Sequence, residues 1–266
     1  MKMIITLTPS ESKRLIGRAV AGMDMVQKAW SKGRVYITNG TTNAFVLEEL
    51  TETEMDKSKF AAGIVCHGVH CVTPDEERMS PRYYRHGKEV EASFPGLLDD
   101  FSAEDVIIKG GNAVDPQGNV GIMLANPQGG TIGHALGRIA ARGIPLVLPV
   151  GLEKLIPSVR IAASLGGIDK FEHAYGKRVG LIQISNGQVI TELEAFRILA
   201  GVSACHFSSG GVGESQGAVT LVLEGEEKDI LRAKKIVASI KGEAPLPELK
   251  MDCSQCKECS QSGINN

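Results

Sequence analysis

The hydrophobic positions of the chain follow two repeats, one typical of buried strands and one typical of amphipathic helices. Short apolar runs occur at residues 34–38, 60–66, 106–108, 145–150 and 178–184. Between such runs apolar residues recur every three or four positions, as they do in residues 132–140. Strands that alternate with helices predict β–α–β units. We therefore expect an α/β fold with an open, mainly parallel, Rossmann-like sheet and helices on both faces.

The last third of the chain has a different pattern. Strand-like segments occupy residues 189–192, 204–208 and 218–223, and helix-like segments occupy residues 193–199 and 229–240. This β-α-β-β-α order predicts a small ferredoxin-like α+β module that lacks one strand, which residues 178–184 or another element could supply. We thus expect an α/β ligand-binding domain at residues 1–187, the ferredoxin-like module at 188–243, and a polar tail containing cysteines at 244–266.

Composition limits the class of partner. The 266 residues include 29 Lys and Arg against 31 Asp and Glu, and the resulting charge of −2 offers no general attraction to nucleic acid or acidic membranes. No apolar run is long enough to cross a bilayer, and the short N-terminal one ends at Thr8. We therefore expect a cytoplasmic protein with reduced thiols that does not bind nucleic acid or membranes.

Three predicted turns are rich in glycine and small polar residues. They contain Gly40, Thr41, Thr42 and Asn43 in the first, Gly111 and Asn112 in the second, and Gly129, Gly130 and Thr131 in the third. The first and third turns precede helices, whose leading N–H groups and positive dipole end favour a phosphate or carboxylate. We expect these residues to bind a small phosphorylated metabolite. The alternative is an ordinary turn capped by a Thr or Asn side chain.

Three side chains near these turns are candidates for catalysis. Asp115 could act as a general base or orient a substrate hydroxyl, although Asp before Pro116 also favours an Asx turn. Lys109, at a strand end, could pair with a phosphate or take part in proton movement, or else face solvent. His134, in the first turn of a helix, could donate to a carbonyl as a neutral imidazole, or else lie on the helix surface.

The central stretch also resembles known sugar-phosphate enzymes. Residues 110–115, Gly-Gly-Asn-Ala-Val-Asp, are similar to the Gly-Ala-Asp-Glu-Val-Asp turn of ribose-5-phosphate isomerases. Residues 118–120 and 143–145 are similar to methylthioribose-1-phosphate isomerases, and residues 40–42 resemble the phosphate turn of sugar-phosphate-binding transcription regulators. Over residues 30–185 the chain thus resembles the superfamily that joins ribose-5-phosphate isomerase, glucosamine-6-phosphate deaminase and the CoA transferases.

The resemblance implies a sugar-phosphate pocket, an isomerase-like activity and a homo-oligomer. Asn112, Ala113 and Asn119 stand where those families have acids, so the resemblance does not supply a base. One alternative is a non-catalytic protein that binds or senses a phosphometabolite on the same fold. Another is a CoA-transferase-like protein, since CoA transferases use a glutamate nucleophile and Glu153 follows a predicted strand. For Glu153, a surface pair with Lys154 competes with that role.

Cysteines suggest a third alternative, a metal- or cluster-dependent protein. Cys253, Cys256 and Cys259 have the spacing that begins bacterial iron–sulfur motifs, so the tail could hold zinc or an iron–sulfur cluster, or its thiols could be incidental. A second group comprises Cys66, His67, His70 and Cys71. Without a turn at Gly68, at most two of these four could point into one metal site.

Overall fold

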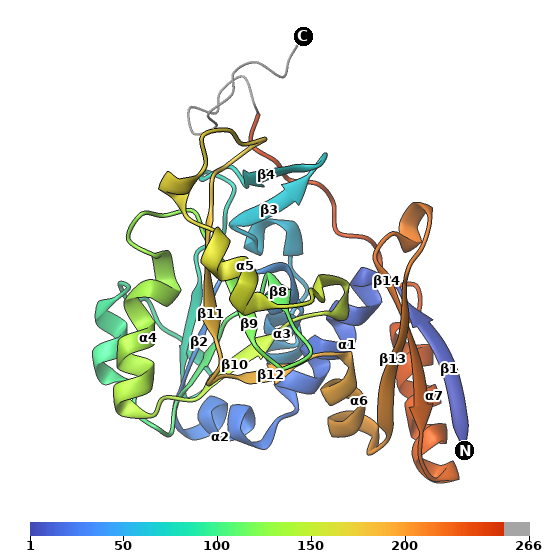
Figure 1. Ribbon diagram of the computed structural model, residues 1–266. Helices are drawn as coiled ribbons and strands as arrows, with labels where there is room; N and C mark the ends of the chain where they lie inside the picture. The colour runs from blue at the N-terminus through green and yellow to red at the C-terminus, as the bar shows by residue number, and fades with distance from the viewer. Residues whose placement is uncertain (253–266) are drawn as a thin grey trace.

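The computed structural model describes residues 1–252, whose arrangement Figure 1 shows. Within this range the protein is an α/β structure with seven α-helices and strands in four sheets. The predicted α/β class is therefore confirmed. Among the same residues, no helix has both the length and the apolar character needed to cross a membrane.

The largest sheet has six strands. Across the sheet they are β12 (Gln188–Ile190), β10 (Leu146–Pro149), β7 (Val106–Ile108), β2 (Arg34–Ile37), β5 (Arg82–Arg85) and β6 (Lys88–Glu89). The first four are parallel to one another, whereas β5 and β6 run antiparallel to their neighbours. The sheet is thus mixed and mostly parallel. Its finer, Rossmann-like classification stays a prediction.

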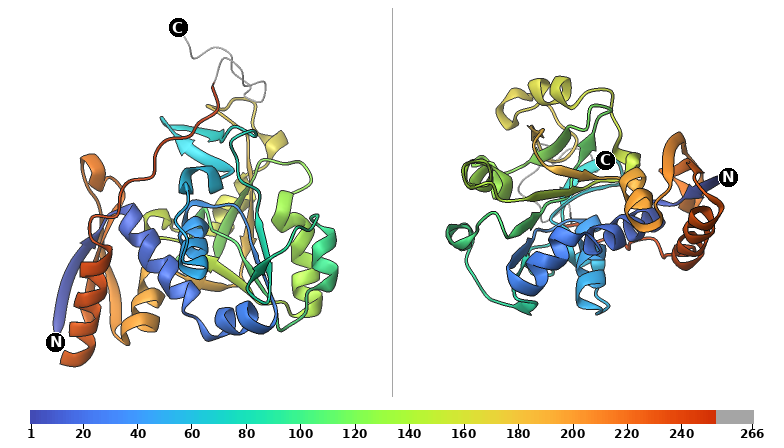
Figure 2. Two further views of the ribbon diagram at one scale, coloured as in Figure 1. Left: turned by 180° about the vertical axis from the view of Figure 1, so that it is seen from behind. Right: turned by 90° about the horizontal axis from the view of Figure 1, so that it is seen from below.

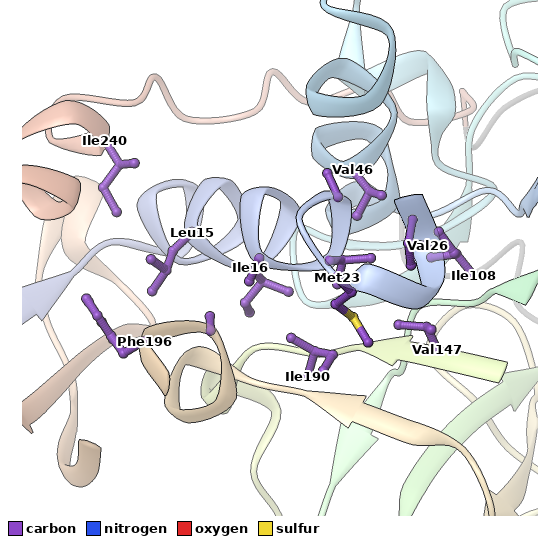
Figure 3. Packing of buried hydrophobic residues seen from close by; sticks show 14 of the residues in the cluster. Leu15, Ile16, Met23, Val26, Val46, Ile108, Val147, Ile190, Phe196 and Ile240 are labelled. Atoms are coloured by element: carbon purple, nitrogen blue, oxygen red, sulfur yellow. The ribbon is translucent and has the colours of Figure 1, made fainter. Parts of the chain in front are cut away.

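One face of this sheet packs on helices from the first part of the chain. They are α1 (Pro9–Ala21), α2 (Asp24–Lys32) and α3 (Thr41–Thr51). Figure 3 shows Ile16 of α1 above Ile190, and Val26 of α2 beside Ile108 and above Val147. The capping box of Thr8 and Glu11 starts α1, with the Thr8 N–H donating to Glu11 Oε2 over 2.9 Å.

The other face packs on α4 (Gly130–Arg142) because successive side chains of a strand point to opposite sides. Tyr36, Ile107 and Leu148 enter this second core together with Ile132 and Ile139 of the helix. A three-stranded antiparallel sheet closes the core. It consists of β11 (Gly180–Ile184), β9 (Val120–Leu124) and β8 (Ala113–Val114), flanked by α5 (Val159–Leu165). The predicted strand at residues 178–184 is therefore present but outside the parallel sheet.

Two segments before residue 92 differ from the prediction. The run at residues 60–66 was expected to be a buried strand, but it ends in an exposed hairpin of β3 (Gly63–Cys66) and β4 (Val69–Val72). Val65 is 66% exposed, because the hairpin pairs with itself and does not enter the six-stranded sheet. Conversely, β5 lies outside the apolar runs that predicted strands, and it buries Tyr83 and Tyr84.

The C-terminal part forms a separate antiparallel sheet in the order β1 (Lys2–Leu7), β14 (Ala218–Glu224), β13 (Ser203–Gly210), with α6 (Glu192–Ala200) and α7 (Glu227–Ile240) packed on it. The missing strand is thus supplied by the N-terminus, and the predicted first strand of the module, β12, belongs to the six-stranded sheet. The ferredoxin-like arrangement is therefore not confirmed. Figure 2 shows this sheet at the opposite side of the molecule from α4.

Candidate functional site

A cavity of about 870 Å³ opens beyond the carboxyl ends of the parallel strands β2 and β7. Thr38 and Lys109, the residues that directly follow these strands, both line it. Ligand sites of α/β sheets are found in this place because the loops that leave the strands converge there. All three glycine-containing turns predicted from the sequence contribute to its lining.

The first turn supplies the start of α3. Gly40, Thr41 and Thr42 line the cavity, and no side chain caps the helix. Thr42 Oγ1 is buried and has no hydrogen-bond partner among the described residues, so it is available to a ligand. Asn43 does not line the cavity. It is fully buried, and its Nδ2 donates to Thr38 O over 2.8 Å, so it holds the turn in place.

In the second turn, the backbone of Gly111 lies close to the side chains of Val120 and Val150. A Cβ on Gly111 would lie 2.5 Å from Val120 Cγ1, so only glycine fits there without movement. Asn112 lines the cavity, and its Oδ1 accepts a hydrogen bond from the Met123 N–H at 2.9 Å. The Asn112 side chain therefore holds β9 in place, and the group that it presents beside the cavity is an amide.

The third turn supplies the start of α4. Gly129, Gly130 and Thr131 line the cavity, and this helix also lacks a side-chain cap. Gly129 has a φ of +80° and Gly130 a φ of +56°, a left-handed conformation that glycine adopts at little cost. Two uncapped helix N-termini thus face one cavity, and the unpaired N–H groups of a helix start attract anions.

Four lysines, Lys13, Lys109, Lys154 and Lys177, add positive charge to this cavity. Lys109 is half-buried, and loss of hydration together with the nearby charge of Lys154 lowers its pKa to about 8. In the described part of the chain no carboxylate offsets this effect on Lys109. Lys154 Nζ donates to Gly111 O over 3.0 Å, and burial lowers its pKa as well. Lys13, at the start of α1, also lines the cavity and is 9% exposed.

Two carboxylates, those of Glu153 and Glu192, lie next to these lysines. Glu153 Oε1 is 3.5 Å from Lys13 Nζ, and its Oε2 is buried with no hydrogen-bond partner within residues 1–252. Glu192 is fully buried, and its Oε2 accepts from the Leu152 N–H at 2.9 Å. Burial, followed by the charge of Glu153, raises the pKa of Glu192 to about 7. The expectation that Glu153 and Lys154 form a pair on the surface is wrong. The Glu153 side chain is largely buried, and Lys154 lines the cavity.

Asp115 lies outside the cavity lining. Its carboxylate is 3% exposed and accepts from the N–H groups of Gln117, Asn119 and Val159 and from the Asn119 amide. Burial alone would raise the pKa of Asp115, but these hydrogen bonds lower it below its ordinary value. The observed contacts match the Asx turn and link it to the start of α5, so Asp115 is placed as a positioning residue.

His134 does not contribute to the cavity lining. His134 is exposed on α4, and its ring meets the Phe94 ring edge-on, with centroids 6.1 Å apart. Cys253, Cys256 and Cys259, predicted to bind metal, lie outside the described residues.

The sequence interpretation missed Lys13, Lys154 and Glu192. A signal existed for two of them, because Lys154 and Glu192 follow the ends of strands β10 and β12 within a few residues. Lys13 gave no such signal, since it lies on a helix that approaches the cavity only through the fold. Comparison with models of protein families, with curated proteins and with solved structures found no match. The superfamily resemblance therefore rests on the short motifs alone.

Proposed function

We propose that the protein is a sugar-phosphate isomerase-like enzyme that holds a small phosphorylated metabolite in this cavity. The observation that carries the proposal is the convergence of two uncapped helix N-termini and four lysines on one cavity. Helix N–H groups and ammonium groups are the donors that proteins use for phosphate. The buried, unpartnered Thr42 hydroxyl supplies a further donor at the same place.

Lys109 is the group that moves the proton in this proposal, in place of the acids of the resembling families. Its neutral amine takes a proton from the carbon next to the substrate carbonyl, and the electron pair forms an enediolate. The ammonium of Lys154 stabilises the negative oxygen. The proton then returns to the adjacent carbon, and a hydroxyl proton moves to the former carbonyl oxygen. With a pKa of about 8, about a tenth of Lys109 is neutral at pH 7.

The test compares ribose 5-phosphate with ribose, which differ by the phosphate alone. We expect calorimetric binding and isomer formation with the phosphate ester and neither with the free sugar. Lys154→Met should weaken binding at least about tenfold, because it removes a charged donor from the cavity. Lys32→Met, at an exposed lysine on α2, is the matched control and should bind as the natural protein does.

A second candidate is a non-catalytic phosphometabolite-binding protein. It is favoured by Asp115, whose carboxylate is already engaged by backbone and amide donors. Tight binding of several sugar phosphates without turnover of any would support this candidate over the enzyme. Failure of a panel of sugar phosphates to bind would contradict both.

A further inference from the structure

A group of potential metal ligands lies at the rim of the cavity, away from the anion-binding turns. It consists of Cys66 and His67 of the β3–β4 hairpin and Glu248 of the C-terminal segment. Their donor atoms all lie within 4.8 Å of one another, and His67 Nε2 is 2.9 Å from Glu248 Oε2. Figure 1 shows the C-terminal segment, in red, running up to this hairpin.

We propose that Cys66, His67 and Glu248 bind a divalent transition metal of the zinc class. A thiolate, an imidazole and a carboxylate are the three side-chain ligand types of protein zinc sites. Ideal tetrahedral zinc geometry places such donor atoms about 3.3–3.6 Å apart. The His67–Glu248 separation is 2.9 Å and no separation in the group exceeds 4.8 Å, so small side-chain rotations are enough to reach those values.

The hairpin turn is what brings the first two ligands together. His67 has a φ of +50° and Gly68 a φ of +76°, the left-handed pair that a two-residue hairpin turn requires. The sequence interpretation allowed more than two ligands in one site only with a turn at Gly68, and that turn is present. It places the adjacent Cys66 and His67 on one side of the hairpin end, where both reach Glu248.

A backbone contact fixes the third ligand. The Met251 N–H donates to Val72 O over 3.0 Å, so the C-terminal segment is held against β4 three residues after Glu248. Cys66 is 8% exposed, whereas His67 and Glu248 have exposed side chains that can rotate onto an ion. Cys66 and Glu248 also line the cavity, so an ion bound to them would lie next to it.

The hairpin offers matched controls for two ligands. Cys71 lies on β4, and its Sγ donates to Val72 O at 3.5 Å, whereas His70 forms no part of the three-residue group. The experiment uses the full chain with Cys253, Cys256 and Cys259 changed to Ser, so that the tail thiols cannot bind the metal. Cobalt(II) absorption reports thiolate ligation, and competition with a chromophoric chelator gives the zinc affinity.

We expect this chain to bind one zinc equivalent with a cobalt–thiolate band. Cys66→Ser should abolish the band and weaken zinc binding more than about 100-fold, above the loss typical of groups that only support a ligand. Glu248→Ala, at an exposed position, should weaken binding at least about tenfold with an unchanged melting temperature of the metal-free protein. Cys71→Ser and His70→Asn should leave affinity and spectrum unchanged.

Absence of binding when the tail thiols are changed, or an equal loss in Cys71→Ser, would overturn the proposal. If Cys66→Ser fails to fold, His67→Asn replaces it, since Asn tolerates positive φ. The metal site does not rest on the proposed sugar-phosphate function. Lys154→Met should weaken phosphate binding and leave zinc affinity unchanged, so the two proposals fail separately.

Discussion

At the scale of single residues, Lys109 carries the most direct prediction. A general base must be neutral, and the neutral fraction of a lysine rises with pH through its pKa. Because the pKa of Lys109 is lowered to about 8, kcat/KM for sugar-phosphate isomerisation should rise with pH up to about 8 and then level off. The measurement is a pH profile of initial rates at substrate concentrations well below KM. Lys109→Met should remove the activity, and Lys32→Met should preserve the profile.

Glu192 predicts how stability depends on pH. Its pKa is raised from an ordinary 4.5 to about 7, so the folded protein retains the proton that the unfolded chain releases. The stabilisation is present below pH 4.5 and is lost as pH rises to about 7, which corresponds to about 3 kcal/mol. Urea unfolding of Glu192→Gln between pH 4.5 and 8 should show a flatter curve than the natural protein.

The control for this experiment is Glu91→Gln, at an exposed glutamate. Its free energy of unfolding should follow the natural curve across the whole range. If the curve of unfolding free energy against pH for Glu192→Gln were parallel to that of the natural protein, the raised pKa of Glu192 would not be the source of the pH dependence.

At the scale of elements, two glycines with opposite surroundings make a matched pair. Gly111→Ala would place a Cβ 2.5 Å from Val120 Cγ1, so it should destabilise the protein by about 1–3 kcal/mol. Gly137, on α4, has open space around its Cβ position, so Gly137→Ala should stabilise by about 0.5–1 kcal/mol. Chemical denaturation measures both. A neutral Gly111→Ala would show that the turn after β7 is loose.

Periodicity predicted the elements better than their pairing. The buried strands after residue 100 lie close to where apolar runs indicated them, since an apolar run must enter the core. The exposed β3–β4 hairpin was misjudged because a short apolar run does not reveal which partner it will pair with. Strand β5 was missed because its Arg-Tyr-Tyr-Arg sequence alternates weakly, and its tyrosines bury their rings against Trp30 and Phe101.

The candidate site was predictable where ligand groups follow strands directly. Gly40, Thr42 and Lys109 were identified in this way, and the structure places them on one cavity. Lys13 lines the same cavity, and the charge of Glu192 acts on Lys154 beside it. These two residues, Lys13 and Glu192, are 179 positions apart in the sequence. A local pattern cannot predict such a meeting, because it depends on how α1 crosses the sheet.

At the scale of the whole molecule, α1 packs against both the six-stranded sheet and the sheet of β1, β14 and β13. Leu7 of β1, Phe196 of α6 and Val147 of the six-stranded sheet belong to a single buried cluster, and Trp30 packs against it. We therefore expect one unfolding transition, with coincident curves from Trp30 fluorescence and far-ultraviolet circular dichroism. Leu7→Ala should destabilise by about 2–5 kcal/mol and shift the Trp30 signal equally, although Leu7 is in the other sheet.

Ile4→Ala is the control for this prediction, because Ile4 lies on the same strand and is 62% exposed. It should change the free energy of unfolding by less than about 1 kcal/mol. A Trp30 transition that stays in place when the Leu7→Ala circular dichroism curve moves would show that the two sheets unfold separately.

The pairing of β1 with β14 has a consequence for synthesis on the ribosome. Thr6 and Thr220 face each other across these strands at a sequence separation of 214 residues. Strand β1 therefore leaves the ribosome long before β14, with which its backbone groups pair. Because distant pairings form slowly and unpaired edges promote aggregation, β1 is a vulnerable edge of the nascent chain during this interval. A chaperone that shields a strand edge would act on residues 2–7 until β14 has been made.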